Sequence, residues 1–150
     1  MSRLVVLRAF VVALGLSHPG VSVAAAGPQA AAAPGSALDY ETFKAKVQPI
    51  LMAKRKGHAR CISCHAQGGG DAYLEPLPVG SPGYSEDQTR RNFERITQRL
   101  VVAGDPMKSL LLTNPLAEDA GGSHWHGGGK HWQSQTDPEW QTLAAWVRGK

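Results

Sequence analysis

The sequence predicts an all-α fold of short helices joined by long loops. Apolar residues recur at spacings of three and four in several segments, as they do on one face of an amphipathic helix. No segment shows the alternation of apolar and polar residues that a half-buried strand requires. Residues 67–83 and 117–135 are rich in glycine or other turn-forming residues and are typical of irregular structure. We therefore expect three to five helices and no sheet.

The first 37 residues are not expected to belong to the folded domain. Arg3 and Arg8 precede an apolar run over 9–16, and a tract of alanines follows the run. This is the order of parts in a secretory signal peptide. The run is much shorter than the roughly 20 residues that a membrane-spanning helix needs. We predict a signal peptide over 1–26, an Ala/Pro-rich linker over 27–37, and one domain over 38–150 that is exported to the periplasm.

The charge of the chain points to no special partner. The formal net charge is +4, and removal of the two arginines of the signal peptide leaves +2, an ordinary value for a soluble domain. The run Lys54-Arg55-Lys56, with Arg60, is interpreted as a solvated helix face. We expect no nucleic-acid partner.

The first predicted helix covers residues 39–54. Asp39 supplies a side chain that accepts backbone N–H bonds at a helix start, and Gly57 is expected to end the helix. Pro49 lacks a backbone N–H and therefore breaks one helical hydrogen bond, which predicts a kink. The apolar face of this helix consists of Tyr40, Phe43, Val47, Ile50 and Leu51.

The middle of the chain contains a longer and a shorter helix. Ser85, followed three residues later by Gln88, has the pattern of a capping box and starts a helix that we expect to reach about Val102. Asp105 and Pro106 start the shorter helix, because proline is favoured at the first helical position. The apolar side of the shorter helix consists of Met107, Leu110 and Leu111.

The last predicted helix begins at Asp137 and Pro138, which again pair a capping residue with an early proline. Its apolar face consists of Trp140, Leu143, Ala144 and Val147, with Trp146 at the edge. The tryptophans expected to form interior walls are Trp125, Trp132, Trp140 and Trp146. The apolar residues are too few for a large core, so we expect a bound group to complete the interior.

Both cysteines lie in the stretch RCISCHAQGG, two residues apart and followed directly by a histidine. Cys61, Cys64 and His65 thus form the Cys-x-x-Cys-His pattern of c-type haem attachment. Two thiols on one short turn can form thioethers to the porphyrin vinyl groups, and the adjacent imidazole can bind the iron. A disulfide here would close too small a loop to stabilise much, and a zinc half-site would need two more ligands. We predict one covalent haem c, with Cys61 and Cys64 as thioether partners and His65 as proximal ligand.

Residues 38–150 resemble a class I monohaem cytochrome c, and in particular the small planctomycete-type domains of environmental bacteria. The motifs that carry the resemblance are, in chain order, FKAKVQPIL, CISCH, GDPMKSLLL, HGGGK and LAAWV. The resemblance implies short helices and long loops around one covalent haem. It also implies that the first and last helices cross, with Phe43 in contact with Trp146 or Leu143.

The same resemblance bears on both sides of the iron. A proline carbonyl after the motif is expected to accept a hydrogen bond from His65, and Pro76 or Pro78 would supply it. The distal ligand of the family comes from the loop before the last helix, where this chain has HWHGGGKHW. We predict His126, because the glycines after it let the backbone approach the porphyrin closely; Met107 is the alternative. The other options left open are His124, His131, an open site, and a surface copper or zinc site of His124, His126 and His131.

Together these features predict an electron-transfer protein, not itself an enzyme, that carries single electrons between a redox donor and an acceptor. Two alternatives stay open. One is a haem-based ligand-binding or peroxidase-like protein with an open or displaceable sixth site. The other is the haem subunit of a larger oxidoreductase. No membrane span is expected after signal cleavage, and iron with two histidine ligands would have a lower potential than iron with methionine and histidine.

Overall fold

The computed structural model describes residues 38–67 and 72–150. The predicted signal peptide 1–26 and linker 27–37 lie outside the described residues, as do 68–71.

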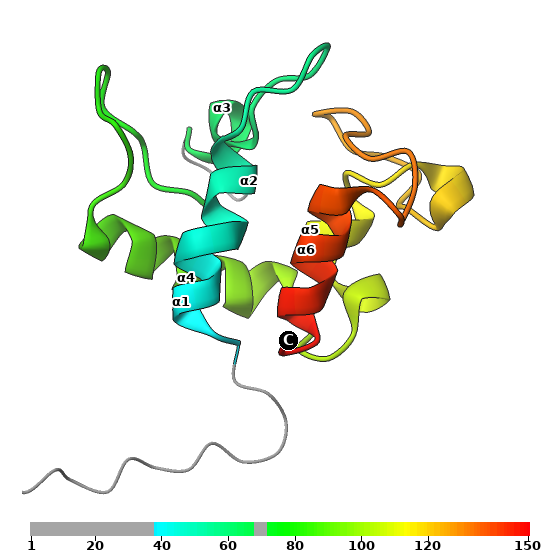
Figure 1. The fold of residues 1–150 in the computed structure, drawn as a ribbon. Helices are drawn as coiled ribbons and strands as arrows, with labels where there is room; N and C mark the ends of the chain where they lie inside the picture. Colours follow the sequence, from blue (N-terminus) through cyan, green and yellow to red (C-terminus); the bar gives the residue numbers. More distant parts are fainter. Residues whose placement is uncertain (1–37, 68–71) are drawn as a thin grey trace, which may run out of the picture. The chain divides into compact units, whose positions relative to one another are not determined.

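The described segments are helical and contain no β-strand, which confirms the all-α prediction (Figure 1). The helical elements in chain order are α1 (Tyr40–Thr42), η1 (Phe43–Val47), α2 (Gln48–Met52), α3 (Cys61–His65), α4 (Glu86–Leu100), η2 (Pro106–Lys108), α5 (Leu110–Thr113), η3 (Glu118–Ala120) and α6 (Pro138–Val147). None of the helices in these segments has the length and hydropathy that a membrane span requires.

The first helix runs without interruption from α1 through η1 to α2. The side chain of Asp39 caps it, accepting from the backbone N–H of Thr42 at 2.6 Å as predicted. The segment η1 is a π-helical turn, in which the N–H of Gln48 donates to the carbonyl of Phe43, five residues earlier. Because Pro49 has no N–H to continue the α-helical ladder, the predicted kink takes the form of a change in hydrogen-bond register just before it.

The C-terminal end of this helix was predicted wrongly. It ends at Met52, two residues before the predicted bound at 54 and well before Gly57, because Ala53 adopts an extended conformation (φ −64°, ψ 138°). The side chain of Arg55 folds back and its Nη2 donates to the carbonyl of Ile50 at 2.8 Å. That bond gives a second donor to a carbonyl that also accepts from the N–H of Ala53 at the helix end.

The predicted starts of the later helices are confirmed. Ser85 and Gln88 form the reciprocal bonds of a capping box at the start of α4, which ends at Leu100, two residues before the predicted end. Asp105 accepts from the N–H groups of Met107 and Lys108 at the start of η2. Asp137 accepts from the N–H of Glu139 at the start of α6 at 3.0 Å.

The apolar side predicted for the short middle helix is wrong in part. Met107 and Leu110 are 38% and 47% exposed, whereas Leu111 and Leu112 are buried. The reason is that the predicted helix is split into the 3₁₀ turn η2 and the single turn α5, so helical spacing does not extend from Met107 to the leucines.

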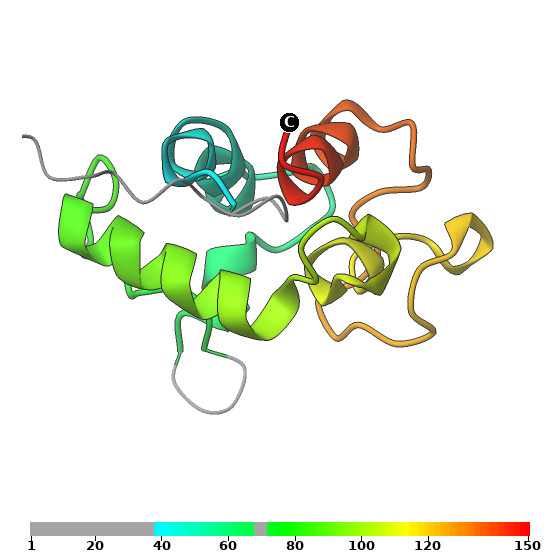
Figure 2. The same ribbon diagram turned by 90° about the horizontal axis from the view of Figure 1, so that it is seen from below.

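The first and last helices lie side by side, and α4 crosses both (Figures 1 and 2). At the crossing, the rings of Phe43 and Trp146 have centroids 5.6 Å apart, which confirms the predicted contact. Phe93 of α4 packs edge-on against Phe43 at 5.4 Å. Trp146 is buried rather than at an edge, and its indole N–H donates to the carbonyl of Asp39 at 2.9 Å. Trp125, predicted to be an interior wall, is 80% exposed.

Candidate functional site

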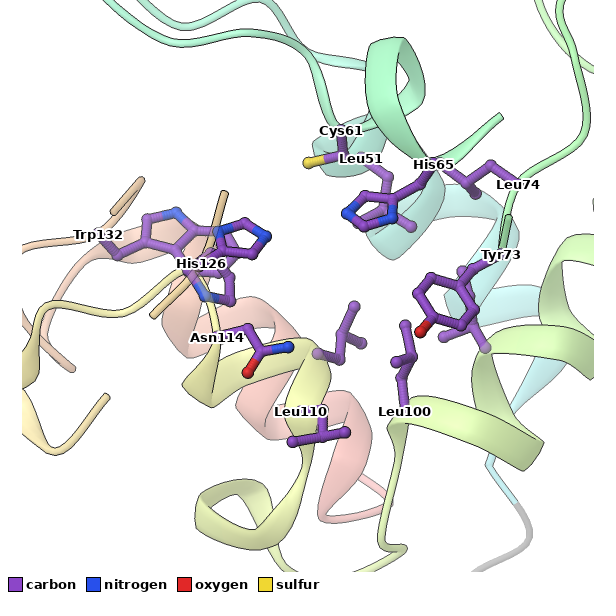
Figure 3. A pocket seen from close by; sticks show the side chains of 13 residues that line it. Leu51, Cys61, His65, Tyr73, Leu74, Leu100, Leu110, Asn114, His126 and Trp132 are labelled. Atoms are coloured by element: carbon purple, nitrogen blue, oxygen red, sulfur yellow. The ribbon is translucent and has the colours of Figure 1, made fainter. Parts of the chain in front are cut away.

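A cavity of about 540 Å³, counted with its opening to solvent, lies beside α3 and is closed by side chains from α4, α5 and the loop before α6 (Figure 3). Most of its lining side chains are leucine, isoleucine or proline. The lining side chains that carry a polar or titratable atom are Cys61, His65, Tyr73, Asn114, His126 and Trp132.

The helix α3 carries the first two of these groups to the cavity. Cys61 and His65 are four residues apart and therefore project from the same helical face. Cys64, directly before His65, is exposed, and neither cysteine is in a disulfide. Burial raises the pKa of the Cys61 thiol, an effect that the neighbouring Arg55 cation opposes. Cys61 is consequently a neutral thiol at neutral pH.

The imidazoles of His65 and His126 face one another across the cavity. Their ring planes are within 8° of parallel, and their centroids are 6.2 Å apart. Figure 3 shows a ring nitrogen of each turned toward the other. The structure therefore brings together the predicted proximal and distal ligands, which are 61 positions apart in the chain.

The orientation of His126 is fixed by its own loop. Its Nδ1 donates to the carbonyl of Gly129 at 2.7 Å, so the opposite nitrogen, Nε2, keeps a free lone pair. A Cβ on Gly128 would lie 3.1 Å from the Cε1 of His126, and Gly129 has a φ of +81°. The glycines thus let the loop close tightly around its own histidine.

The other ligand candidates lie elsewhere. Met107 does not line the cavity, and its methyl group lies beside Gly121 instead. His124 is exposed, with its Nδ1 3.0 Å from a carboxylate oxygen of Glu118. His131 packs against His58 with the rings tilted by 33° and 4.7 Å between centroids, and burial, followed by the nearby His58 and Arg55, lowers the pKa of His131 to about 4.

Neither of the metal sites considered as alternatives is found in the part of the chain that the structure describes. No group of three or more histidine, cysteine, aspartate or glutamate side chains there is placed to hold a metal ion. The histidines His124, His126 and His131 therefore do not form a surface copper or zinc site. Cys61 and Cys64 likewise gain no further ligands that would complete a zinc site.

No family model, curated protein or solved structure matches this chain. The side chains that line the cavity therefore indicate its chemistry. Two opposed imidazole nitrogens are suited to bind a transition-metal ion from both sides. One thiol, Cys61, lines the apolar cavity and the other, Cys64, is exposed beside it on α3, a placement suited to covalent bonds with a bound organic group. Both features are present together here.

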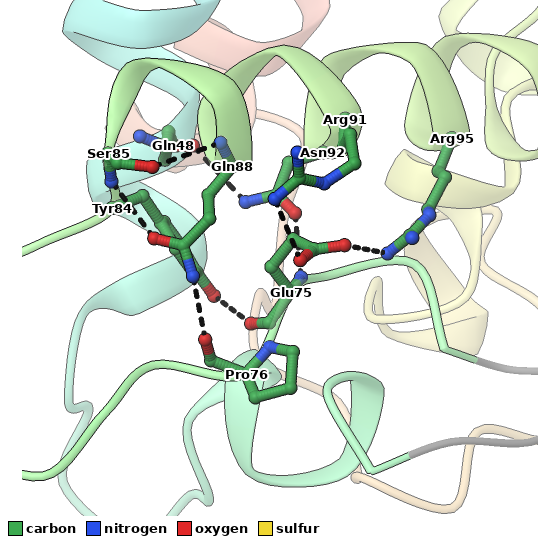
Figure 4. Close-up of polar contacts among 9 residues, drawn as sticks. All are labelled: Gln48, Glu75, Pro76, Tyr84, Ser85, Gln88, Arg91, Asn92 and Arg95. Atoms are coloured by element: carbon green, nitrogen blue, oxygen red, sulfur yellow. Dashed lines mark hydrogen bonds and ion pairs between the residues drawn. The ribbon is translucent and has the colours of Figure 1, made fainter.

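The segment that follows the cavity-lining Tyr73 and Leu74 is held onto α4 by polar contacts (Figure 4). The carboxylate of Glu75 forms ion pairs with Arg91 at 3.3 Å and Arg95 at 2.6 Å. The backbone N–H of Glu75 donates to the buried Asn92 at 2.7 Å. These contacts fix one wall of the cavity against the longest helix.

Two further contacts hold this segment. The hydroxyl of Tyr84 donates to the carbonyl of Glu75 at 2.8 Å, and burial raises the pKa of Tyr84 to about 12. The carbonyl of Pro76 accepts from Gln88 of α4 at 3.0 Å. The carbonyl of Pro78, by contrast, accepts within the loop, from the N–H of Ser81 at 3.0 Å. The bond from His65 to one of these prolines stays a prediction.

Three residues of this region were missed by sequence reasoning. Tyr73 and Asn114 line the cavity but belong to no recognisable motif. Arg55 was interpreted as part of a solvated basic run, yet its side chain is only 13% exposed. No feature of the sequence distinguishes Arg55 from Lys54 and Lys56, the exposed lysines on either side of it.

Proposed function

We propose that this protein is a class I-like c-type cytochrome that carries single electrons between redox partners after export to the periplasm. One haem would be attached through thioethers to Cys61 and Cys64. His65 would be its proximal ligand and His126 its distal ligand.

The facing of His65 and His126 is the observation that carries the proposal. With metal–nitrogen bonds of about 2 Å on each side and a ring centroid about 1 Å behind each nitrogen, two imidazoles on opposite sides of one metal ion have centroids about 6 Å apart. The distance between the two centroids here is 6.2 Å. Two histidines that merely packed together would stack closer, as His58 and His131 do at 4.7 Å.

The lining of the cavity is mainly apolar, which suits the faces of a porphyrin. Cys61 lies at its edge and Cys64 next to it at the surface, and both are unpaired thiols, which thioether formation requires. The cysteine-bearing edge would be the part of the haem nearest to solvent and to partners.

The axial ligands and the apolar lining would set the reduction potential of the iron. The iron would carry the electron by changing between its ferric and ferrous states. The bond between His126 and Gly129 holds the imidazole in the tautomer that presents Nε2 to the cavity. The leucines around the site would make the surroundings of the iron apolar, and two nitrogen ligands favour a low potential. The partners would be a redox donor and an acceptor.

Spectroscopy of the ferric and ferrous protein tests the proposal. A six-coordinate low-spin spectrum without the near-infrared band of methionine-bound ferric haem is expected. The double variant Cys61→Ser with Cys64→Ser should lose covalent haem on a denaturing gel. Covalent haem in that variant, or none in the natural chain, would refute the proposal.

One observation favours a second candidate, a haem protein that binds a small ligand at the sixth position. The bond that fixes His126 lies within its own irregular loop, so the ring could leave without disrupting a helix. Figure 3 shows the amide nitrogen of Asn114 directed into the same cavity, where it could donate to a bound ligand. Rapid binding of carbon monoxide by the ferrous protein would support this function over simple electron transfer.

A further inference from the structure

The ring of Tyr73 lies against the imidazole of His65. The two ring centroids are 5.4 Å apart, and the ring planes differ by 34°. Figure 3 shows the two side chains next to each other on the wall of the cavity that both of them line. This separation is within the range at which aromatic rings attract each other. Tyr73 is therefore a direct contact of the predicted proximal ligand, although it lies outside the Cys-x-x-Cys-His motif.

The backbone next to Tyr73 is tied to α3. The N–H of Leu74, the following residue, donates to the carbonyl of His65 at 2.9 Å, and the side chain of Leu74 is buried in the core. The ion pairs of Glu75 with two arginines hold the same segment onto α4. The backbone that carries Tyr73 is consequently fixed close to His65.

The ring of Tyr73 has a second neighbour in α4. The guanidinium carbon of Arg99, an exposed residue near the end of that helix, lies over the ring at 5.0 Å from its centroid. A cation is attracted to the face of an aromatic ring. Tyr73 is thus held at its backbone by α3 and at its ring by α4.

A histidine on a helix can still turn its ring about the bond between Cβ and Cγ, because that torsion has broad energy wells. For His126, the bond to the carbonyl of Gly129 restricts the turn. For His65, the ring of Tyr73 packed against it has the same effect. This contact acts on the ring itself rather than on its N–H, so it is independent of the predicted bond to a proline carbonyl. The two restrained imidazoles lie within 8° of parallel.

We propose that Tyr73 is a positioning residue that sets the plane of the His65 imidazole and so keeps the two axial imidazoles of the haem parallel. This inference rests on the proposed function, because it requires His65 and His126 to bind the iron together. A ligand held in one plane would not have to turn when the iron gains or loses an electron.

Electron paramagnetic resonance of the ferric protein tests this role. In low-spin ferric haem, parallel imidazole ligands give a rhombic spectrum with three resolved g values, whereas perpendicular ligands give one very large g value. We expect a rhombic spectrum for the natural chain. A spectrum of the perpendicular type would overturn the proposal, and this measurement decides even if a variant does not fold.

Two variants of Tyr73 separate the ring from its hydroxyl. Tyr73→Leu removes the ring and should raise the largest g value, because the imidazole of His65 could then turn. Tyr73→Phe keeps the ring and should keep the natural spectrum. A spectrum of Tyr73→Phe that matches that of Tyr73→Leu would overturn the role of the ring.

Tyr40→Leu is the matched control. Tyr40 is half-buried like Tyr73, and it also lies under an arginine of α4, with the guanidinium carbon of Arg90 4.4 Å from its ring centroid. Its ring packs against Phe93 at 5.3 Å between centroids instead of against a histidine. The variant therefore removes a comparable ring and should leave the g values unchanged. Equal shifts in Tyr40→Leu and Tyr73→Leu would indicate general loosening of the fold and would overturn the proposal.

The outcomes also separate this inference from the proposed function. A natural chain without covalent haem, or without a low-spin ferric signal, would overturn both. A rhombic low-spin signal whose g values are the same in the natural chain and in Tyr73→Leu would overturn the role of Tyr73 alone.

Discussion

Glu75 and Arg95 form an ion pair of 2.6 Å that joins the loop bearing Tyr73 to the helix α4. Arg91 binds the second oxygen of the same carboxylate at 3.3 Å. The hydrogen bond from Arg91, and secondarily the charges of both arginines, lower the pKa of Glu75 from its ordinary value of 4.5. The ion pairs therefore need Glu75 to be ionised.

We expect Glu75→Gln to reduce the acid sensitivity of the protein. A carboxylate whose pKa is lower in the folded than in the unfolded state stabilises the fold above the unfolded pKa, and that stabilisation is lost as pH falls through the folded pKa. The variant should be less stable at pH 7 by about 1 kcal/mol, since the arginines are partly exposed. The difference should vanish at about pH 3. Urea unfolding at both pH values measures the difference in the free energy of unfolding. Glu94→Gln, at an exposed position of α4, is the control.

Replacement of His126 by alanine should change the coordination of the iron. Loss of the distal nitrogen would leave the ferric iron five-coordinate or water-bound, with a high-spin spectrum. His124→Ala is the matched control, because His124 is exposed and paired with Glu118. A His126→Ala protein with the low-spin spectrum of the natural chain would rule out His126 as the ligand. A methionine-type near-infrared band would instead point to Met107.

Two of the glycines after His126 allow a test of whether the bond to the Gly129 carbonyl holds His126 in place. Gly129→Ala places a side chain at a φ of +81°, which costs about 1–2 kcal/mol. Because the Gly129 carbonyl holds His126, the strain should speed displacement of the histidine by cyanide, by up to about tenfold. Gly127→Ala has open space around its new Cβ and should have no such effect. Equal rates for both variants would contradict the assigned role of the bond.

The crossing of the first and last helices should dominate stability. Phe43 is fully buried against Trp146 and Phe93. Phe43→Ala should lower the free energy of unfolding by about 3–5 kcal/mol. Trp125→Ala, at an exposed tryptophan, should change it by less than about 0.5 kcal/mol. Urea unfolding of the two variants, followed by circular dichroism, compares them; a large effect of Trp125→Ala would mean that this ring is not exposed in solution.

Local sequence patterns were sufficient to predict where four of the helical elements begin. The capping residues Asp39, Ser85, Asp105 and Asp137 all begin helical elements, because their side chains satisfy N–H groups within a few residues. The contact between Phe43 and Trp146 was also predicted, although from the family resemblance rather than from local pattern.

Long-range contacts were not predictable in the same way. Arg55 looks like its neighbours Lys54 and Lys56, and its burial depends on Glu139, 84 positions away. Trp125 was assigned to the interior because tryptophan is usually buried, but its glycine-rich loop has no helical face to turn inward. The facing of His65 and His126 likewise depends on how a loop returns to α3, which no local spacing encodes.

The π-helical turn η1 has a consequence for comparing this chain with others. Such a turn accommodates one more residue than an α-helical turn, and Phe43, Val47 and Leu51 are all buried across it. A relative with a regular α-helix here would align with this chain only through a one-residue gap before the proline. Alignments that forbid gaps within helices would then set the aromatic residues out of register and miss the relationship.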